Sequence, residues 1–316
     1  MNVENFLVVN SKMFILYYLN KTTTKPYSST AAELLSVRRG GELQKITEKE
    51  HRIKIINLSF ESQEYPVMAD FIAKRQSHID EGNHERRKLL LRGNEVVFLQ
   101  SISSYLAIDW ETLSKHTKII PPIPFTKDIN YIKDTIADEN NIHVLFHQGP
   151  GSIRHVMSLG PTVQPVIHPS VDSIGDYSQH LAISHQYILT IGGEKLGQGI
   201  TNMGNRNIAL RMTSLEEETE KKSLVFPFNA YQFYVKSLCV LGDDAYVFGL
   251  NREKKQTQLW KINLKTGTGS NEVFNSISDF SDCNHIQLTA NGFYVLSDGS
   301  LKFYSDESNR QVVPGC

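Results

Sequence analysis

Cysteine is scarce in this sequence. Among 316 residues only Cys239, Cys283 and Cys316 occur, and no two of them are close in sequence. A disulfide framework needs an even set of cysteines, and a thiolate zinc site needs closely spaced ones. We therefore expect neither a disulfide-stapled domain nor a zinc site made of thiolates.

An excess of charge of one sign is also missing. The 33 lysines and arginines nearly balance the 34 aspartates and glutamates, which gives a formal net charge of −1. Proteins that bind nucleic acid through its phosphates usually have clearly more lysine and arginine than aspartate and glutamate. The composition therefore argues against nucleic acid as the partner.

Long hydrophobic runs do not occur. The first apolar residues are split at Asn10, Ser11 and Lys12 into two pieces of strand length, which are too short to span a membrane. They show neither the basic segment nor the small-residue cleavage site of a secretory signal. From the sequence we expect a soluble cytoplasmic protein that does not associate with membranes.

Common catalytic and nucleotide-binding motifs are absent as well. The sequence has no phosphate-binding glycine loop, no G-x-S-x-G elbow and no H-E-x-x-H motif. The glycine-rich segment 192–205 lacks the spacing of a phosphate loop and is interpreted as a connection between strands. Carboxylates such as Asp138, Asp243 and Asp244 fall in turn-like contexts. We expect no cofactor, and the sequence favours a role other than catalysis.

Paired strand signals, in contrast, are abundant. Short runs of Val, Ile, Leu, Tyr and Phe recur, and Gly, Asn, Asp or Ser separates them. Gly93 and Asn94 stand between two such runs, where a tight hairpin favours residues that tolerate positive φ. Four segments share the plan of strand, short polar turn and more apolar strand: 88–101, 180–193, 236–250 and 285–299.

A second pair of strands follows several of these hairpins. Residues 105–119, 258–273 and 301–313 each combine strand, polar turn and strand, so the unit has four antiparallel strands. The later units start 43 to 56 residues apart, and all starts lie near Phe6, Lys88, Tyr131, His180, Lys236 and His285. This period is typical of a β-propeller blade. Because a four-stranded sheet buries both apolar faces only between neighbours, residues 1–316 are predicted to form one closed, all-β propeller.

The first interval is 82 residues, nearly two periods. Residues 51–87 are interpreted either as a degenerate blade that begins with the strand 52–60 or as an insertion. Seven blades are preferred, and six blades with an insertion are the alternative. Apolar residues within 66–75 have helical spacing after Pro66, so the insertion would be partly helical. A further helical turn is predicted within 214–224, which has the spacing of a capping box.

The two ends of the chain are expected to meet. An exposed apolar edge strand invites aggregation, so the first strand, 5–10, needs a neighbour. We predict that it lies beside residues 310–314 from the other end of the chain.

The strand pattern resembles known propeller families. Residues 187–193, YILTIGG, resemble the second strand and double glycine of a kelch repeat, and residues 247–267 resemble its loop and aromatic third strand. The four-strand unit is also similar to that of WD-repeat propellers, although their Gly-His and Trp-Asp pairs are absent. The resemblance implies a platform for protein interactions.

Histidines cluster between residues 143 and 155. His143 and His147 share one face if they lie on a strand, and a turn would bring His155 back beside them. A metal ion would need a third ligand such as His168, but Arg154 is adjacent and no carboxylate is placed to orient a ring. We therefore expect hydrogen-bonded or surface histidines and no metal.

Basic residues gather in the predicted connections between second and third strands. If the units have four strands, these connections leave the same face of the propeller. Such a face would suit an acidic or phosphorylated protein partner. The candidate partner-binding residues are Lys195, Arg206, Arg252, Lys254 and Lys255, and Lys21 and Lys25 hold the corresponding place in the first unit.

The function that these observations favour is a non-enzymatic propeller that binds a protein partner or serves as a subunit of a larger assembly. Two alternatives stay open at this stage. One is a propeller hydrolase or lyase that acts on a carbohydrate, whose carboxylates need to meet only in space. The other is a lectin-like carbohydrate-binding module.

Overall fold

The computed structural model describes most of the chain as strands and short turns. None of the described residues forms a helix long and apolar enough to cross a membrane. The described residues are 2–25, 44–58, 67–73, 88–101, 104–119, 131–147, 154–160, 166–168, 180–184, 187–193, 207–214, 220–229, 231–274, 283–289, 292–297, 300–305 and 311–313.

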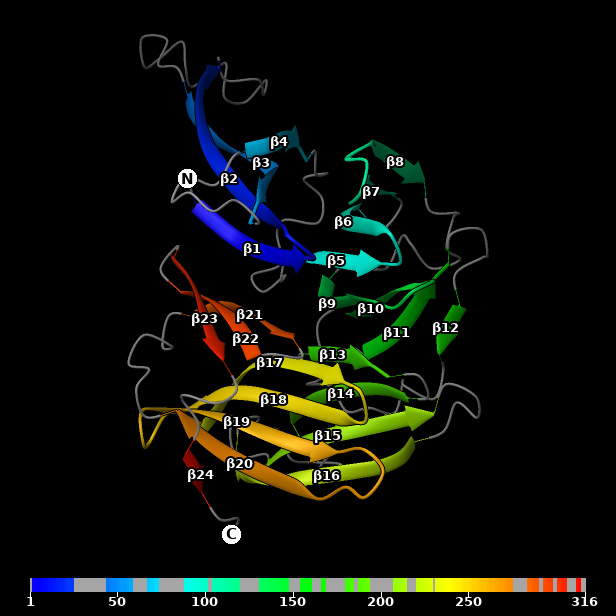
Figure 1. The fold of residues 1–316 in the computed structure, drawn as a ribbon, viewed down its shortest axis with the longest axis vertical. Helices are drawn as coiled ribbons and strands as arrows, with labels where there is room; N and C mark the ends of the chain where they lie inside the picture. Colours follow the sequence, from blue (N-terminus) through cyan, green and yellow to red (C-terminus); the bar gives the residue numbers. More distant parts are fainter. Residues whose placement is uncertain are drawn as a thin grey trace, which may run out of the picture.

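The described strands form six antiparallel sheets, which we number in chain order (Figure 1). Sheets one to four each contain four consecutive strands, sheet five contains five, and sheet six contains three. The strands of sheets one to three are β1 (Asn2–Val9), β2 (Lys12–Lys25), β3 (Gln44–Asn57), β4 (Val67–Ile72); β5 (Leu89–Arg92), β6 (Glu95–Ser101), β7 (Ser104–Asp109), β8 (Lys115–Ile119); and β9 (Tyr131–Ala137), β10 (Ile142–His147), β11 (Arg154–Leu159), β12 (Val166–His168).

The second half of the chain continues the same plan. Sheet four has β13 to β16 and sheet six has β21 to β23, whereas β24 joins the outer edge of sheet five. Their bounds are β13 (His180–Ile183), β14 (Tyr187–Gly193), β15 (Asn207–Ser214), β16 (Glu220–Asn229); β17 (Phe233–Leu241), β18 (Asp244–Asn251), β19 (Gln256–Asn263), β20 (Gly269–Phe274), β24 (Gln311–Val313); and β21 (Cys283–Thr289), β22 (Gly292–Ser297), β23 (Ser300–Ser305).

The first strand of each sheet contacts the first strand of the next. These contacts run from β1 through β5, β9, β13 and β17 to β21, and β21 also contacts β1. Side chains reinforce them, because the backbone N–H of Leu89 donates to Asn5 Oδ1 at 2.7 Å and that of Leu181 donates to Asp134 Oδ2 at 2.9 Å. Several antiparallel four-stranded sheets that touch in this order fit a propeller-like, all-β fold.

The hydrophobic core lies between the sheets. Separate clusters of buried side chains fill the spaces between sheets one and two, two and three, three and four, four and five, and five and six. Both faces of a strand therefore carry apolar residues, as in β18, where Val247 packs toward sheet four and Phe248 toward sheet six. Each fully buried side chain of this size contributes about 1.5–3 kcal/mol to stability.

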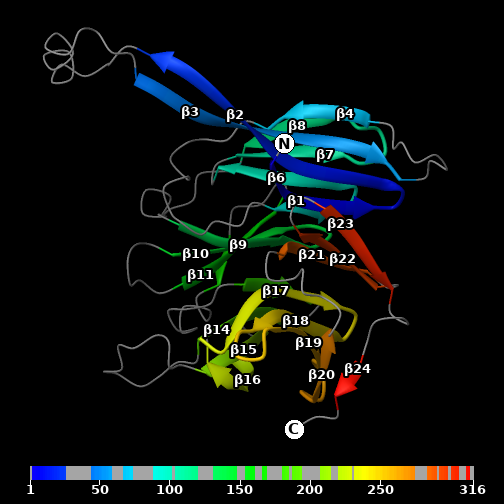
Figure 2. The same ribbon diagram turned by 90° about the vertical axis from the view of Figure 1, so that its left-hand side faces the viewer.

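Sheet one explains the long first interval. β2 and β3 are each 14 residues long and pair along their whole length, and their far ends extend beyond the other described strands (Figure 2). Residues 51–57 are therefore the end of the third strand of this sheet and do not start a separate blade. Residues 59–66 and 74–87 lie outside the described residues.

The predicted helix at 66–75 is wrong where the structure describes it, because Val67–Ile72 is the strand β4. Its apolar residues at both faces imitate helical spacing: Ala69 and Phe71 pack toward sheet two, whereas Ile72 is exposed on the other side. Met68 lies where the register of β4 on β3 shifts. The predicted helical turn within 214–224 is also wrong for residues 220–224, which belong to β16. Residues 215–219 lie outside the described residues.

The predicted neighbour of the first strand is wrong as well. β24 pairs with β20, in a register that joins Asn271 to Val313, and β1 instead contacts β5 and β21. The reason is that β21, the first strand of sheet six, already covers the side of β1 that needs a neighbour.

One turn recurs between third and fourth strands. Asp109 Oδ1 accepts hydrogen bonds from the backbone N–H and the hydroxyl of Thr112, at 2.7 and 2.9 Å, and Leu113 follows with φ of 60°. Asn263 holds Thr266 in the same way, at 3.0 and 3.3 Å, and Gly267 has φ of 71°. Sheets two and five thus share a local structure as well as a strand order.

Candidate functional site

The structure places only part of the predicted partner site. Arg252, Lys254 and Lys255 occupy the exposed turn between β18 and β19. Lys195 and Arg206 lie outside the described residues, and Lys21 and Lys25 belong to β2 and not to a connection. The candidate site is therefore built around the β18–β19 turn.

Backbone contacts fix the shape of this turn. Asn251 is 7% exposed, and its Oδ1 accepts the backbone N–H of Lys254 at 3.0 Å. The backbone N–H of Arg252 donates to the carbonyl oxygen of Gln232 at 2.7 Å, which ties the turn to the segment between β16 and β17. Lys255 has φ of 51°, in the left-handed region, so the chain reverses sharply there.

Two tyrosines lie beside the turn. Tyr231 is 59% exposed. Tyr234 has the guanidinium of Arg252 5.2 Å and the ammonium of Lys236 5.0 Å from its ring centre. We name the group the basic–aromatic surface; it consists of Tyr231, Tyr234, Lys236, Arg252, Lys254 and Lys255.

Positive charge prevails on this surface. The turn contains one carboxylate, Glu253, and its Oε1 accepts a hydrogen bond from Gln232 Nε2 at 3.0 Å. Among the described residues, the ammonium groups of Lys254 and Lys255 have no ion-pair partner, and both side chains are exposed. Such a surface attracts an anionic partner, and the tyrosines add rigid contact area.

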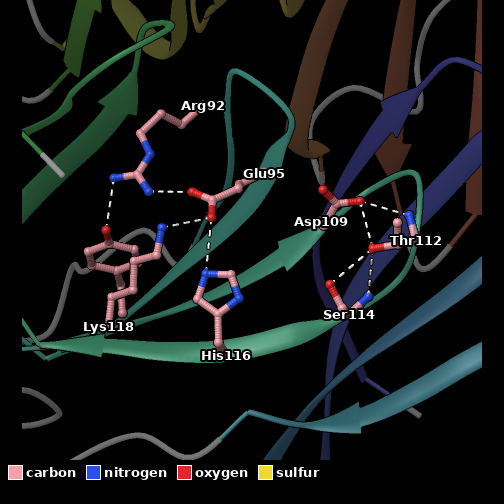
Figure 3. A network of polar contacts seen from close by, with 8 residues as sticks. Arg92, Glu95, Asp109, Thr112, Ser114, His116 and Lys118 are labelled. Carbon is pink, nitrogen blue, oxygen red and sulfur yellow. Dashed lines mark hydrogen bonds and ion pairs between the residues drawn. The ribbon is translucent and has the colours of Figure 1, made fainter.

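A second cluster of cations lies in sheet two (Figure 3). The carboxylate of Glu95 accepts from Arg92, from Lys118 at 2.8 Å and from His116 Nε2 at 3.0 Å. Partial burial would raise the pKa of Glu95, but the bonds from Lys118 and Arg92 outweigh it and lower that pKa. Arg92 also donates to the hydroxyl of Tyr105 at 2.9 Å. Because Arg92 and Lys118 already share a carboxylate, they offer less attraction to a ligand than the β18–β19 turn.

A chain of buried and partly buried polar groups crosses sheet three. His143 Nε2 lies 2.9 Å from Asp138 Oδ2, and His143 Nδ1 lies 2.7 Å from the hydroxyl of Ser158. The same hydroxyl lies 2.7 Å from His168 Nε2. His143 and His168 are 2% and 7% exposed. The expectation that no carboxylate orients a ring here is therefore wrong, because Asp138 does so from the turn that precedes β10.

Hydrogen bonds to Asp138 determine the pKa of its carboxylate. Burial alone would raise the pKa of Asp138, but the hydrogen bond from His143 and those from the backbone of Asn141 and Asn140 lower it well below its ordinary value. Asp138 Oδ2 accepts the Nε2–H of His143, and the hydroxyl of Ser158 lies between His143 Nδ1 and His168 Nε2.

This geometry resembles the hydrogen bonds of a serine nucleophile, with one difference. Here the hydroxyl of Ser158 lies between two buried rings, because both His143 and His168 are within hydrogen-bond distance of it. The arrangement therefore links β9, β10, β11 and β12 across the sheet, which suits a structural role. No group of three His, Cys, Asp or Glu side chains in the described part is arranged to hold a metal ion. The side chains of His147 and His155 lie outside the described residues.

Sequence reasoning missed half of the basic–aromatic surface. Tyr231 lies in the connection before β17, Tyr234 and Lys236 belong to β17, and Arg252 follows β18. The pairing of β17 with β18 brings them together, with Phe233 opposite Asn251. The only sequence signal was the predicted hairpin at 236–250, which joins the two connections at one end.

Comparisons with known proteins give no family. No protein-family model matches the chain, and no curated protein matches its sequence. Among solved structures, the chain is similar to Kluyveromyces lactis Hsv2 with complete loop 6CD, with 8% identity and a TM-score of 0.41 over 96% of this chain and 73% of that one.

Proposed function

We propose that the chain is a six-bladed β-propeller that binds an acidic segment of a protein partner on its basic–aromatic surface. Each of the six sheets would be a blade, and the contacts among β1, β5, β9, β13, β17 and β21 would line the centre. The kelch-like and WD-like strand pattern supports the same architecture, and such propellers commonly serve as interaction platforms.

One observation carries the functional part of the proposal. Arg252, Lys254 and Lys255 are exposed on a single turn whose backbone is fixed by Asn251 and Gln232. A fixed turn loses little conformational entropy when a partner binds. Arginine and tyrosine are also the residues that most often contribute large binding energies at interfaces.

Charge reversal tests the proposal. The variant with Arg252→Glu, Lys254→Glu and Lys255→Glu turns attraction into repulsion. The probe is a fluorescent synthetic peptide rich in glutamate and aspartate, and its anisotropy reports binding. We expect the wild type to bind it, more weakly as salt rises because such contacts are screened over about 8 Å. We expect the variant not to bind and to melt at nearly the wild-type temperature, since exposed charges contribute little to folding.

A matched control separates a site from a general charge effect. Lys54→Glu, Lys115→Glu and Lys265→Glu lower the net charge by the same amount but lie in β3, in β8 and in the β19–β20 turn, outside the β18–β19 turn. This control is expected to bind the peptide like the wild type. If it loses binding as fully as the triple variant, the surface is not a site. A phosphoserine peptide in parallel would reveal a preference for phosphate over carboxylate.

A further inference from the structure

Sheet six is one strand shorter than the other sheets. β21, β22 and β23 pair in that order, and β23 has no outer neighbour among the described residues. Its six residues, Ser300–Ser305, therefore leave one edge of backbone N–H and carbonyl groups without a described strand partner. An edge of this kind pairs readily with another strand.

The strand that follows in the chain does not fill this place. In each of the other five sheets the strand after the third pairs with the third. β24 is the strand after β23, but it pairs with β20 at the outer edge of sheet five, where Val312 lies opposite Glu272. The described part of the chain thus leaves the fourth position of sheet six open.

An aromatic row leads to this position. On the side of sheet six that faces sheet one, Tyr294 contacts the buried Phe6, with ring centres 6.3 Å apart and the rings edge to face. Phe303 of β23 lies next in the row, 4.8 Å from Tyr294. Phe6 is 1% exposed, but Phe303 is 47% exposed. The row is therefore buried at its inner end and uncovered at its outer end.

Sheet one provides a second uncovered wall. Ala69 and Phe71 of β4 pack toward sheet two, so Asp70 and Ile72, which alternate with them, point to the side where sheet six lies. Ile72 is 47% exposed. Asp70, on the same side, accepts the hydroxyl of Tyr17 at 2.8 Å, which confirms the orientation of this face. Ile72 is thus an exposed apolar side chain on the face of sheet one that is turned toward sheet six.

We infer that the outer edge of β23 binds an extended segment of a partner protein, which adds to sheet six as its fourth strand. The segment would form backbone hydrogen bonds with Ser300–Ser305, and its apolar side chains on one face would cover Phe303 and Ile72. In this mode of recognition, the backbone hydrogen bonds between the two strands provide the affinity, and the side chains at alternate positions provide the specificity. It is a separate surface from the β18–β19 turn and does not depend on the function proposed above.

The distance of the β23 edge from the outer strands of the neighbouring sheets determines which kind of partner can bind there. Because the inner strands of all sheets contact one another, a three-stranded sheet ends about 4.8 Å short of a four-stranded one. The edge of β23 is therefore recessed between the outer strands of sheets one and five. A single extended segment fits such a slot. The edge of β23 in a second copy is equally recessed, so two copies cannot join edge to edge.

The experiment uses the full chain and a strand-forming peptide. The probe is a fluorescent peptide of about ten residues that alternates valine and threonine between terminal lysines, a length that covers a typical strand. Binding is followed by anisotropy, and amide hydrogen exchange is measured with and without peptide. We expect saturable binding and slower exchange within Ser300–Ser305. Phe303→Glu and Ile72→Glu are expected to weaken binding by about tenfold each, the scale of one good interface contact.

Two controls make the result specific. Val166→Glu changes an equally exposed apolar residue, 46% exposed, on the outer strand of sheet three, and should leave binding unchanged. A peptide of the same composition with two central prolines cannot complete a ladder and should not bind.

Three outcomes would overturn the inference. The first is no binding, or equal binding of the proline peptide. The second is a dimer in light scattering that Phe303→Glu dissolves, because a second copy would then fill the slot. The third is faster exchange in β23 after truncation at residue 309, because the C-terminal segment of the chain itself would then be the occupant.

Discussion

The side-chain amide of Gln287 forms two hydrogen bonds with the backbone of Val8, although 279 positions separate them. Val8 N–H donates to Gln287 Oε1 at 2.8 Å, and Gln287 Nε2 donates to the carbonyl oxygen of Val8 at 3.0 Å. A glutamine amide has the same donor and acceptor groups as a peptide unit. It therefore imitates a strand neighbour and fastens β21 of sheet six to β1 of sheet one.

Replacing Gln287 by alanine should destabilise the protein. Both backbone groups of Val8 would lose their partner in a partly buried place, which costs about 1–3 kcal/mol of unfolding free energy. Gln287→Glu keeps the acceptor and loses the donor, so its effect should be as large or larger because its carboxylate meets a carbonyl oxygen. Urea unfolding measures both. An alanine variant within error of the wild type would show that the two bonds do not hold the sheets together.

Gly249 should tolerate no side chain. A Cβ at this position would lie 2.5 Å from the ring of Phe233 and 2.7 Å from the backbone oxygen of Tyr234. Phe233 is 1% exposed and cannot move aside, so Gly249→Ala should cost about 1–3 kcal/mol or more. The matched control is Gly269→Ala, whose Cβ would come no closer than 3.3 Å to any atom. Equal melting temperatures for the two variants would contradict this account.

The strand order could be predicted because its signals are local. Gly93 has φ of 52°, as a tight hairpin requires, and the predicted start at Tyr131 is the first residue of β9. Alternating apolar residues between polar turns are enough to place such hairpins. The same signal failed at Val67–Ile72, because a strand with apolar residues on both faces imitates a helix.

Features that depend on pairing between distant segments were not predictable. Nothing local shows that Gln311–Val313 joins β20, since three residues carry too little pattern to choose an edge. Tyr234 and Arg252 meet only through the register of β17 on β18. Asp138 was interpreted as a turn residue, which it is, but its contact with His143 depends on how the pairing of β9 with β10 places the ring.

The polar chain in sheet three predicts the tautomers of two histidines. An ionised Asp138 requires Nε2–H on His143, and when Ser158 donates to His143 Nδ1, its oxygen requires Nε2–H on His168. Nitrogen chemical shifts of the two rings should report these forms. Ser158→Ala removes the shared hydroxyl and should cost about 1–3 kcal/mol, since it leaves two buried ring nitrogens without that partner. Nδ1–H on His143 would contradict the assignment.

The same network predicts how stability depends on pH. The pKa of Asp138 is lowered in the folded protein below its ordinary value of 3.8. The unfolded chain therefore binds the proton more readily, and this carboxylate stabilises the fold above about pH 4 and loses that effect as the pH falls through its folded pKa. Asp138→Asn removes the effect, so the stability difference between wild type and variant should narrow from about pH 4 downward, measured by urea unfolding at each pH.

The control is Glu139→Gln, which changes the exposed carboxylate next to Asp138 and should follow the wild type. A difference that stays constant down to about pH 2 would mean that the hydrogen bonds from His143, Asn140 and Asn141 do not hold Asp138 in its charged form.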